Sequence, residues 1–498
     1  MNALLVQPIP PARVFPRGAY RNMHVPTGLA YVASALQRAG HTVRVLAREE
    51  QLHKHGCNRV AADEDLRRLL RSFHPDLVGL AVLSPSLEDA AEVARWAKEL
   101  CGSATRVIAG GVHPTVLGSE MLAAMPELDA AVVGEGEATL VELAAGKPAG
   151  QVAGTFYRED GRVLSAPPRP PLRDLDALEP IDYGLFDMAY YTAPSRWLIR
   201  WLKLSATNLR TSRGCTNACQ FCAGTLVSGL GVRFHSPEFV VEQMERVVKG
   251  LGVKAIHFED DTLGADPDRL ARLCAAIRRL GLETRVVWDG CLRVDQVAPE
   301  LLAEMKAAGC IQIEYGFETA SDRTLSLLGK GSTVAQNRRA VELTRKAGLR
   351  IFADIMMGLP EETAADLRAT REFVRWAAPE VLSFGQMSFL PGSPMFRRLS
   401  ETQRAAMDYA DTVYPEGAAG INLTAMSDAE LARQRREMFR YWAIPCMKRQ
   451  FLRDSTPADE PERRQWRREL RRFMLRHPLR YARLPRGPVA SRRVGSLL

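Results

Sequence analysis

The first 150 residues alternate between short apolar runs and longer segments with helical spacing. Runs with the length of buried strands occur at residues 3–6, 41–46, 76–83, 106–109 and 130–133. Between them, apolar side chains recur at helical spacing, as from Leu29 to Ala39 and from Leu66 to Phe73. Strands that alternate with helices form a parallel sheet covered on both faces. Residues 1–150 are therefore predicted to form an α/β domain with a doubly wound, Rossmann-like sheet, and its ligands are expected at the carboxyl ends of the strands.

Residues 151–205 interrupt this alternation because they are rich in proline. The prolines of this stretch are Pro167, Pro168, Pro170, Pro171, Pro180 and Pro194. Proline favours turns and extended backbone. The pattern predicts an ordered connector of extended segments that adds neither a helical nor a sheet layer.

A second alternating series covers residues 206–396. Its strand-like runs end near Thr211 and at residues 256–259, 285–288, 311–315, 351–356 and 381–387. Helical patterns fill the gaps, as at residues 237–248, 267–280 and 334–347. Six βα units are too few for a closed eight-stranded barrel, so the pattern predicts an open, partial TIM barrel with its sites at the carboxyl strand ends. Residues 397–498 are predicted to form a helical extension that becomes basic.

Composition limits the class of protein. The 498 residues are 46% hydrophobic and 25% charged, which is typical of a globular protein with about three domains. No apolar run approaches the roughly 20 residues that span a bilayer, and the N-terminus has no signal-peptide pattern. Nine cysteines without an export signal indicate a reducing compartment, where thiols remain free for metal. We therefore expect a cytoplasmic protein.

The net charge of +9 is concentrated near the C-terminus. Residues 447–498 contain 15 Lys or Arg and only 5 Asp or Glu, so the rest of the chain is nearly neutral. Apolar residues such as Trp466, Leu470 and Phe473 lie among these arginines. This pattern favours a helix that packs its apolar stripe on the protein body. The alternative is peripheral contact with an anionic membrane surface.

Three cysteines lie in the run Ser212-Arg213-Gly214-Cys215-Thr216-Asn217-Ala218-Cys219-Gln220-Phe221-Cys222. Three thiolates on one loop can ligate three irons of a cubane cluster and leave the fourth iron open. Most iron–sulfur clusters have four cysteine ligands, and structural zinc sites have four ligands. A trio without a nearby fourth cysteine is therefore unusual, and the rival interpretation is a chance grouping of structural cysteines.

The cysteine spacing, the preceding Arg-Gly and Phe221 resemble the signature of radical S-adenosylmethionine enzymes. The resemblance implies a 4Fe-4S cluster on Cys215, Cys219 and Cys222, with S-adenosylmethionine chelated by the open iron. It also implies an external electron donor, such as flavodoxin or ferredoxin, and a 5′-deoxyadenosyl radical.

Polar or glycine residues follow the later strands of the second series in the order of this family, over residues 206–396. Carried over from the resemblance, the Phe221 region contacts adenine, and Glu259, Asp260 and Glu318 contact the methionyl amino group or the ribose. Gly358 belongs to the same cofactor site. The acidic residues 259–261 replace the Gly-Gly-Glu of many relatives. Without the resemblance, these residues are equally well explained as helix caps, loop carboxylates and a tight turn.

The N-terminal domain has glycines directly after two of its strands, where a large ligand can lie against bare backbone. These turns resemble the cobalamin-binding domain of one large subgroup of the same enzymes. The candidate cobalamin-binding residues are Ser84, Gly110, Gly111, His113, Pro114, Gly134, Glu135 and Gly136. A nucleotide-binding Rossmann domain is the rival, but no Gly-x-Gly-x-x-Gly follows the first strand. A scaffold that binds nothing is a second alternative.

The histidines after the second strand, His53 and His55, lack the preceding Asp of cobalt-ligating Asp-x-His-x-x-Gly motifs. We interpret them as surface loop residues. Cobalamin would then have no protein histidine below the metal, which in this subgroup accompanies methyl-carrying chemistry.

The resemblance favours a cobalamin-dependent methyltransferase that acts on an unactivated carbon of a small-molecule, natural-product-type substrate. An oxidative cyclase or dehydratase is the alternative, because anaerobic magnesium-protoporphyrin ester cyclases share the two-domain plan. A nucleic-acid modifying enzyme is disfavoured because no appended small β-barrel is found, so no nucleic-acid partner is expected. The sequence assigns no catalytic residue and does not identify the substrate.

Overall fold

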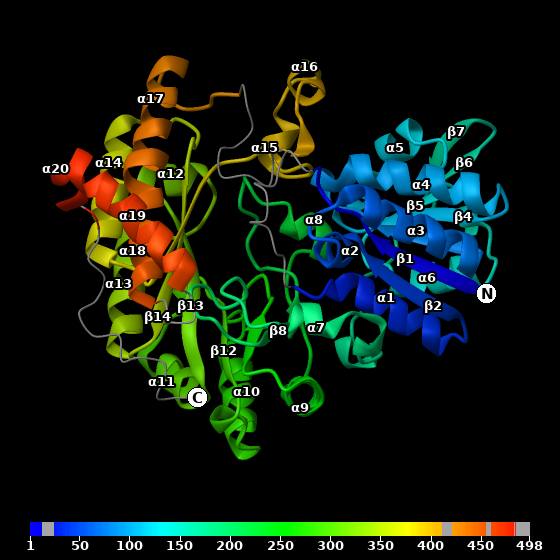
Figure 1. Ribbon diagram of the computed structural model, residues 1–498, viewed down its shortest axis with the longest axis horizontal. Helices are drawn as coiled ribbons and strands as arrows, with labels where there is room; N and C mark the ends of the chain where they lie inside the picture. Colours follow the sequence, from blue (N-terminus) through cyan, green and yellow to red (C-terminus); the bar gives the residue numbers. More distant parts are fainter. Residues whose placement is uncertain (12–23, 411–420, 455–459, 483, 485–498) are drawn as a thin grey trace.

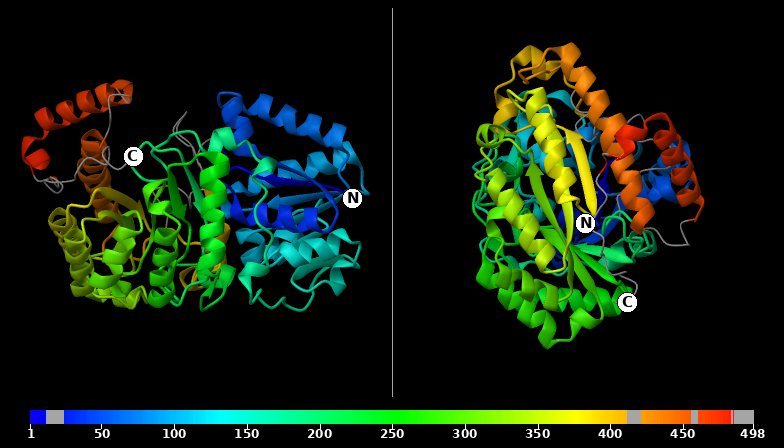
Figure 2. Two further views of the ribbon diagram at one scale, coloured as in Figure 1. Left: turned by 90° about the horizontal axis from the view of Figure 1, so that it is seen from below. Right: turned by 90° about the vertical axis from the view of Figure 1, so that its left-hand side faces the viewer.

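The computed structural model describes residues 1–498 except 12–23, 411–420, 455–459, 483 and 485–498 (Figure 1). Two α/β units lie side by side, as both Figure 1 and the left view of Figure 2 show. The N-terminal domain forms one unit and the later strands form the other. The helices of residues 428–482 pack on the second unit, on the side away from the N-terminal domain.

The N-terminal sheet has the strand order β2-β1-β3-β4-β5-β6-β7, and its first five strands are parallel. These strands are β1 (Asn2–Gln7), β2 (Thr42–Ala47), β3 (Leu77–Ala81), β4 (Arg106–Gly110) and β5 (Ala130–Val132). The main helices are α1 (Thr27–Arg38), α3 (Arg59–Phe73), α4 (Leu87–Cys101), α5 (Val112–Ala124) and α6 (Glu137–Ala144). One buried apolar cluster joins the sheet to α1 and α6, and another joins it to α3, α4 and α5. The predicted doubly wound sheet is confirmed.

The prediction that the connector adds no sheet layer is wrong for its first part. Strands β6 (Thr155–Glu159) and β7 (Arg162–Ser165) form a hairpin that pairs antiparallel with β5. The connecting residues Asp160 and Gly161 both have positive φ. This is the backbone of a tight hairpin turn, for which Asp-Gly is a preferred sequence.

The rest of the connector covers the N-terminal end of the barrel. Short helices η4 (Leu175–Ala177), η5 (Tyr183–Leu185) and α7 (Met188–Tyr191) occur here. Apolar connector side chains such as Leu198 and Ile199 share a buried cluster with Ala206, Ala255 and Val287 of the barrel strands. The end opposite the expected sites is therefore closed by the chain itself.

The second unit is an all-parallel, six-stranded sheet with the order β15-β14-β13-β12-β11-β8, which confirms the predicted open barrel. Its strands are β8 (Ala206–Leu209), β11 (Ala255–Phe258), β12 (Val287–Cys291), β13 (Cys310–Glu318), β14 (Arg350–Met357) and β15 (Val381–Gln386). Helices lie outside the curved sheet (Figure 2). They are α9 (Pro237–Leu251), α10 (Pro267–Arg279), α11 (Pro299–Ala307), α12 (Asp322–Leu327), α13 (Val334–Lys346) and α14 (Ala364–Ala377).

Local sequence fixes where these helices begin. Ser236 accepts a hydrogen bond from the backbone N–H of Phe239, and proline occupies the first helical position of α9. Asp266 caps α10 in the same way, again with proline next. A side-chain acceptor satisfies a free helix-end N–H, and proline has no N–H to leave free.

Further short elements complete the chain. The strands β9 (Ser212–Arg213) and β10 (Arg233–Phe234) pair with each other next to the cysteine loop. The remaining helices are α2 (Arg48–Lys54), α8 (Gly224–Ser228), α15 (Pro394–Arg397), α16 (Glu401–Ala405), α17 (Asp428–Met438), α18 (Ile444–Asp454), α19 (Glu460–Arg476) and α20 (Pro478–Ala482). His53 lies on helix α2 with its ring against Tyr190, so the predicted loop is wrong for this residue, whereas its predicted place at the surface is confirmed because the side chain is exposed.

Helix α19 packs its apolar side chains on the body of the protein. The ring of Trp466 lies 4.3 Å from that of Phe451 and 6.2 Å from that of Trp201, centre to centre. Leu470 is buried, and Phe473 packs against the barrel core. The packing interpretation of the tail therefore holds for the described part of α19, whereas the arginines after residue 484 lie outside the described residues. Over the described ranges, no helix is long and apolar enough to cross a membrane.

We predict that Trp466→Ala destabilises the barrel, because the indole fills the space between Phe451 and Trp201. The expected loss is about 2 kcal/mol in the free energy of unfolding, below the value for a fully buried tryptophan. Urea unfolding followed by circular dichroism measures it. Leu475→Ala on the same helix is the control, because that side chain is 78% exposed and its loss should change little. Equal stability of the two variants would contradict the packing role of α19.

Candidate functional site

The three clustered cysteines lie on the loop between β9 and α8, at the carboxyl end of the first barrel strand. Their thiols form no disulfide; Cys219 is buried, and Cys215 and Cys222 are partly buried. The loop begins at Gly214, whose φ is +101°, and a Cβ there would collide with the backbone oxygen of Gly231. Glycine is therefore required at this position.

Asp260 fixes the base of the cysteine loop. Its carboxylate accepts hydrogen bonds from the backbone N–H groups of Thr211, at 2.6 Å, and of Ser212, at 3.1 Å. The Thr211 hydroxyl donates to the other carboxylate oxygen. This geometry directs Asp260 toward the protein backbone, although the sequence placed it among ligand contacts. Its position favours a role in holding the loop.

The surroundings of the cysteines are buried and include the cations Lys330 and Arg293. Burial raises the pKa of the Cys219 and Cys222 thiols. Lys330 lowers both values in part, and its ammonium donates to Glu318 at 2.6 Å. It also lies 5.9 Å from the centre of the Phe221 ring. Glu318, Lys330 and Phe221 thus form one group beside the cysteine loop.

Gly358 and Glu318 both occupy unusual backbone conformations. Gly358 has a φ of +77°, and its N–H donates to the buried Glu362 carboxylate at 2.7 Å. A tight turn alone accounts for this glycine. Glu318 is not a glycine, yet its φ is +61° at the end of β13. Strained backbone of this kind is concentrated at functional sites.

A cavity of about 400 Å³ lies between the two domains. The glycine turns after β4 and β5 line one side, and residues at the carboxyl ends of the barrel strands line the other. The sequence-predicted residues on its wall are Gly110, Gly111, Gly134, Glu135, Gly136 and Glu259. Lining residues that the sequence did not single out as ligand contacts include His24, Tyr31, Arg210 and Arg213. Parallel strand ends from both units therefore face one shared space.

Ser84, His113 and Pro114 do not line this cavity. The His113 ring bonds to the Ser84 hydroxyl at 2.9 Å, and both residues are buried. Burial lowers the pKa of His113 to about 4, so this imidazole is neutral at pH 7. The hydrogen bond between Ser84 and His113 connects the loop after β3 with the segment after β4, outside the cavity wall.

The glycines of the turns have different physical roles. At Gly111 the φ is +100°, and a Cβ would lie 3.1 Å from the backbone of Val82. Close approach of the backbone at Val82 therefore already requires glycine here, and the predicted ligand contact at Gly111, which also lines the cavity, stays a prediction. At Gly28 and Gly134 an added Cβ would meet no atom of the described residues within 4 Å. These two positions face open space.

Ion pairs connect the N-terminal domain to the cysteine loop. Arg213 contacts Glu135 at 2.9 Å and Glu137 at 2.7 Å, and Arg233 contacts Glu135 at 2.9 Å. The backbone N–H of Leu172 also donates to Glu135. The carboxylate predicted to bind a ligand is thus occupied by the domain interface. Arg213 belongs to the Arg-Gly pair that precedes the cysteines in the sequence. Its carboxylate partners, Glu135 and Glu137, could not be predicted because they are far away in sequence.

Glu259 connects the two domains from the barrel side. Its carboxylate accepts hydrogen bonds from Thr27 and Asn208, both at 3.1 Å, and lies 3.3 Å from His24. Burial opposes ionisation, but His24 and the guanidinium of Arg210 outweigh it and lower the pKa of Glu259 to about 2. This carboxylate is ionised at pH 7 and lies on the cavity wall.

Known protein families match both units. The Radical SAM superfamily matches residues 209–374, and the B12 binding domain family matches residues 17–144. The chain is 30% identical over 400 residues to an uncharacterized methyltransferase of Pyrococcus horikoshii, covering 80% of this chain and 82% of the relative. It is 28% identical over 394 residues to the anaerobic magnesium-protoporphyrin IX monomethyl ester cyclase of Cereibacter sphaeroides, covering 77% of this chain and 62% of that protein.

Solved structures share the fold at low sequence identity. One is the cobalamin-dependent S-adenosylmethionine radical enzyme OxsB, with a TM-score of 0.72, 18% identity and coverage of 97% of this chain and 72% of that chain. Another is the radical S-adenosylmethionine methyltransferase TsrM of Kitasatospora setae, with a TM-score of 0.65, 17% identity and coverage of 92% and 89%. With its cysteine trio, its two matched domains and a relative aligned over most of both chains, the protein belongs to the radical S-adenosylmethionine superfamily, in the group that carries a B12-binding domain.

Proposed function

We propose that this protein is a cobalamin-dependent radical S-adenosylmethionine methyltransferase that acts on a small molecule. The observation that carries the proposal is the interdomain cavity. Its walls combine the glycine turns of the B12-binding domain with Arg210 and Glu259 at the barrel strand ends, beside the cysteine loop. None of the three cysteines lines the cavity, but Arg213, directly before the cysteine loop, does, so a substrate bound there would lie between the glycine turns and the start of that loop.

The cofactor residues fit these assignments. Cys215, Cys219 and Cys222 are free thiols on one short loop and would ligate a 4Fe-4S cluster. The turns at Gly110 and Gly134 would hold cobalamin. When bound, the cluster and S-adenosylmethionine supply radical chemistry, and cobalamin supplies a methyl group.

The chain's own residues organise the site around these groups. Lys330, held by Glu318, places a positive charge beside Cys219 and would help to balance thiolate charge there. Glu259 is an ionised acceptor on the cavity wall. The apolar remainder of the wall, including Leu80, Val132 and Val227, would exclude water from the substrate carbon.

Methyl transfer is favoured over cyclisation by two observations. The Pyrococcus horikoshii relative, of which the alignment covers 82%, is named a methyltransferase, whereas the alignment covers 62% of the Cereibacter sphaeroides cyclase. Neither His53 nor His55 lines the cavity. The described histidine that does line it, His24, contacts Glu259. Cobalamin held at the glycine turns would have neither His53 nor His55 beside it, which the family resemblance associates with methyl-carrying chemistry. An external flavodoxin or ferredoxin would supply the electron.

The experiment that tests the proposed function follows a labelled methyl group. Reconstituted enzyme receives S-adenosylmethionine with a deuterated methyl group and a panel of small-molecule candidates, and products are analysed by mass spectrometry. We expect the label in a product and 5′-deoxyadenosine alongside it. A product formed by loss of hydrogen or water, without label, would instead support the cyclase or dehydratase alternative.

The cluster assignment predicts about four irons per chain after anaerobic reconstitution. Changing any of Cys215, Cys219 or Cys222 to Ala should abolish reductive cleavage of S-adenosylmethionine, measured as 5′-deoxyadenosine. Cys274→Ala is the control, because Cys274 is buried on α10 and should be dispensable for the cluster. Retained cleavage in Cys219→Ala would overturn the assignment.

The cobalamin assignment predicts that a large side chain at Gly28 blocks binding. Gly28 lines the cavity, and an added Cβ there meets no atom of the described part of the chain within 4 Å, so Gly28→Phe should fill the space without straining the backbone. Visible absorbance after gel filtration measures the cobalamin retained. Gly28→Ala is the matched control and should retain it. Full retention by Gly28→Phe would show that cobalamin binds elsewhere.

A further inference from the structure

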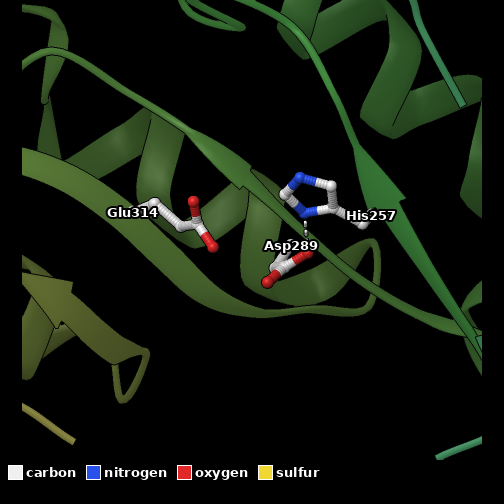
Figure 3. A group of neighbouring side chains, drawn as sticks. All are labelled: His257, Asp289 and Glu314. Atoms are coloured by element: carbon white, nitrogen blue, oxygen red, sulfur yellow. Dashed lines mark hydrogen bonds and ion pairs between the residues drawn. The ribbon is translucent and has the colours of Figure 1, made fainter. Parts of the chain in front are cut away.

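Three side chains that are far apart in sequence meet inside the barrel. His257 lies on β11, Asp289 on β12 and Glu314 on β13, and Figure 3 shows the three converging from neighbouring strands. The ligand atoms of their imidazole and carboxylate groups all lie within 4.8 Å of one another. Strand register produces this meeting, because His257 pairs directly with Asp289 and Cys291 pairs with Glu314.

The group of His257, Asp289 and Glu314 is deeply placed and strongly polar. The His257 ring nitrogen Nδ1 lies 2.8 Å from Asp289, whose side chain is fully buried. The amide of Gln312 donates to the second Asp289 oxygen at 3.1 Å. Gln312 in turn accepts from Arg350 at 3.2 Å. An outer layer of hydrogen bonds therefore fixes the orientation of Asp289, which is the arrangement that orients ligands at metal sites.

The Glu314 carboxylate lacks the hydrogen-bond donors that Asp289 has among the described residues. No residue that the structure describes donates a hydrogen bond to the Glu314 carboxylate, although this carboxylate lies within 4.8 Å of the ligand atoms of His257 and Asp289. Asp289 and Asp354 place further negative charge near it, and His257 and Arg200 place positive charge there. A cation between Glu314 and the His257–Asp289 pair would supply the missing compensation.

The donor set indicates which cation. One imidazole nitrogen with two carboxylates is the ligand type of zinc and other divalent transition metals, whereas calcium and magnesium take oxygen ligands. We propose that His257, Asp289 and Glu314 bind a divalent transition-metal ion of the zinc class in the barrel interior. Three protein ligands leave a coordination position open for water or for an oxygen atom of a substrate.

The site adjoins the interdomain cavity. Glu259 follows His257 by two residues on the same strand and lines the cavity, and the His24 ring lies 5.4 Å from the His257 ring, centre to centre. A metal here would anchor a substrate from the side opposite the N-terminal domain. The inference does not rest on the proposed function, because metal binding is measured without turnover.

The experiment uses the full-length protein with its cluster and cobalamin reconstituted. The protein is freed of adventitious zinc, its cluster and cobalamin are kept in place, and it is dialysed against zinc. Bound zinc is then counted by mass spectrometry separately from iron. We expect about one zinc per chain. Zinc-edge X-ray absorption should show nitrogen and oxygen ligands at about 2.0–2.1 Å with imidazole scattering, whereas thiolate ligands would appear at about 2.3 Å.

Variants then assign the ligands. His257→Ala and Glu314→Gln should each weaken zinc binding by more than the roughly 10- to 100-fold that loss of an outer-shell partner costs. Asp354→Asn is the matched control: it removes one carboxylate charge from the same interior, on the neighbouring strand β14, but leaves the three ligands in place. It should retain zinc. Iron and cobalamin contents report whether each variant is folded.

Three results would overturn the proposal. The first is no zinc retained by the wild-type protein. The second is sulfur ligands in the absorption spectrum, which would place the zinc on the cysteine loop. The third is an equal loss of zinc affinity in Asp354→Asn and Glu314→Gln. That result would indicate that the negative charge of the barrel interior attracts cations without specific ligands, as would suit a substrate ammonium group. The spectrum of the wild-type protein decides the ligand identity even where a variant fails to fold.

Discussion

The contact between Arg213 and the paired carboxylates Glu135 and Glu137 fixes the geometry on which both candidate cofactor regions depend. The Arg213 side chain is 12% exposed, and its two partners are almost as enclosed. Removing one member of a buried ion pair leaves an uncompensated charge, which is far more costly than the net value of the pair. The interface is therefore held in one arrangement. Because Arg213 lies directly before the cysteine loop, that arrangement also positions the thiols.

Much of the fold could be predicted from periodicity, because each βα unit carries its own local pattern. The six barrel strands and the five parallel N-terminal strands followed from short apolar runs between helical segments. The hairpin of β6 and β7 was not predicted because prolines dominate the pattern of residues 151–205, although Asp160-Gly161 is a hairpin signal. The covering of the barrel end by Leu198 and Ile199 could not be predicted, since it depends on tertiary packing.

The candidate site was predictable only where its residues are close in sequence. The cysteine trio has a fixed spacing, and the glycine turns follow recognisable strands. In contrast, Glu259 and Asp260 are adjacent in sequence but differ in role, because one lines the cavity and the other accepts backbone hydrogen bonds. The group of His257, Asp289 and Glu314 was missed because each is a single polar residue on a separate strand. A register shift after Trp288 further separates sequence spacing from spatial position.

The two cofactor regions are joined on more than one side of the cavity. Arg213 links the β5 loop to the cysteine loop, and Glu259 links the start of α1, through Thr27, to the second barrel strand. Asp260, the next residue, holds the backbone of Thr211 and Ser212 at the base of the cysteine loop. A displacement of the N-terminal domain therefore acts on the cysteine loop in two ways, through Arg213 and through the segment Glu259-Asp260. The cavity and the cysteine loop are consequently formed together, and neither region can be rearranged without moving the other.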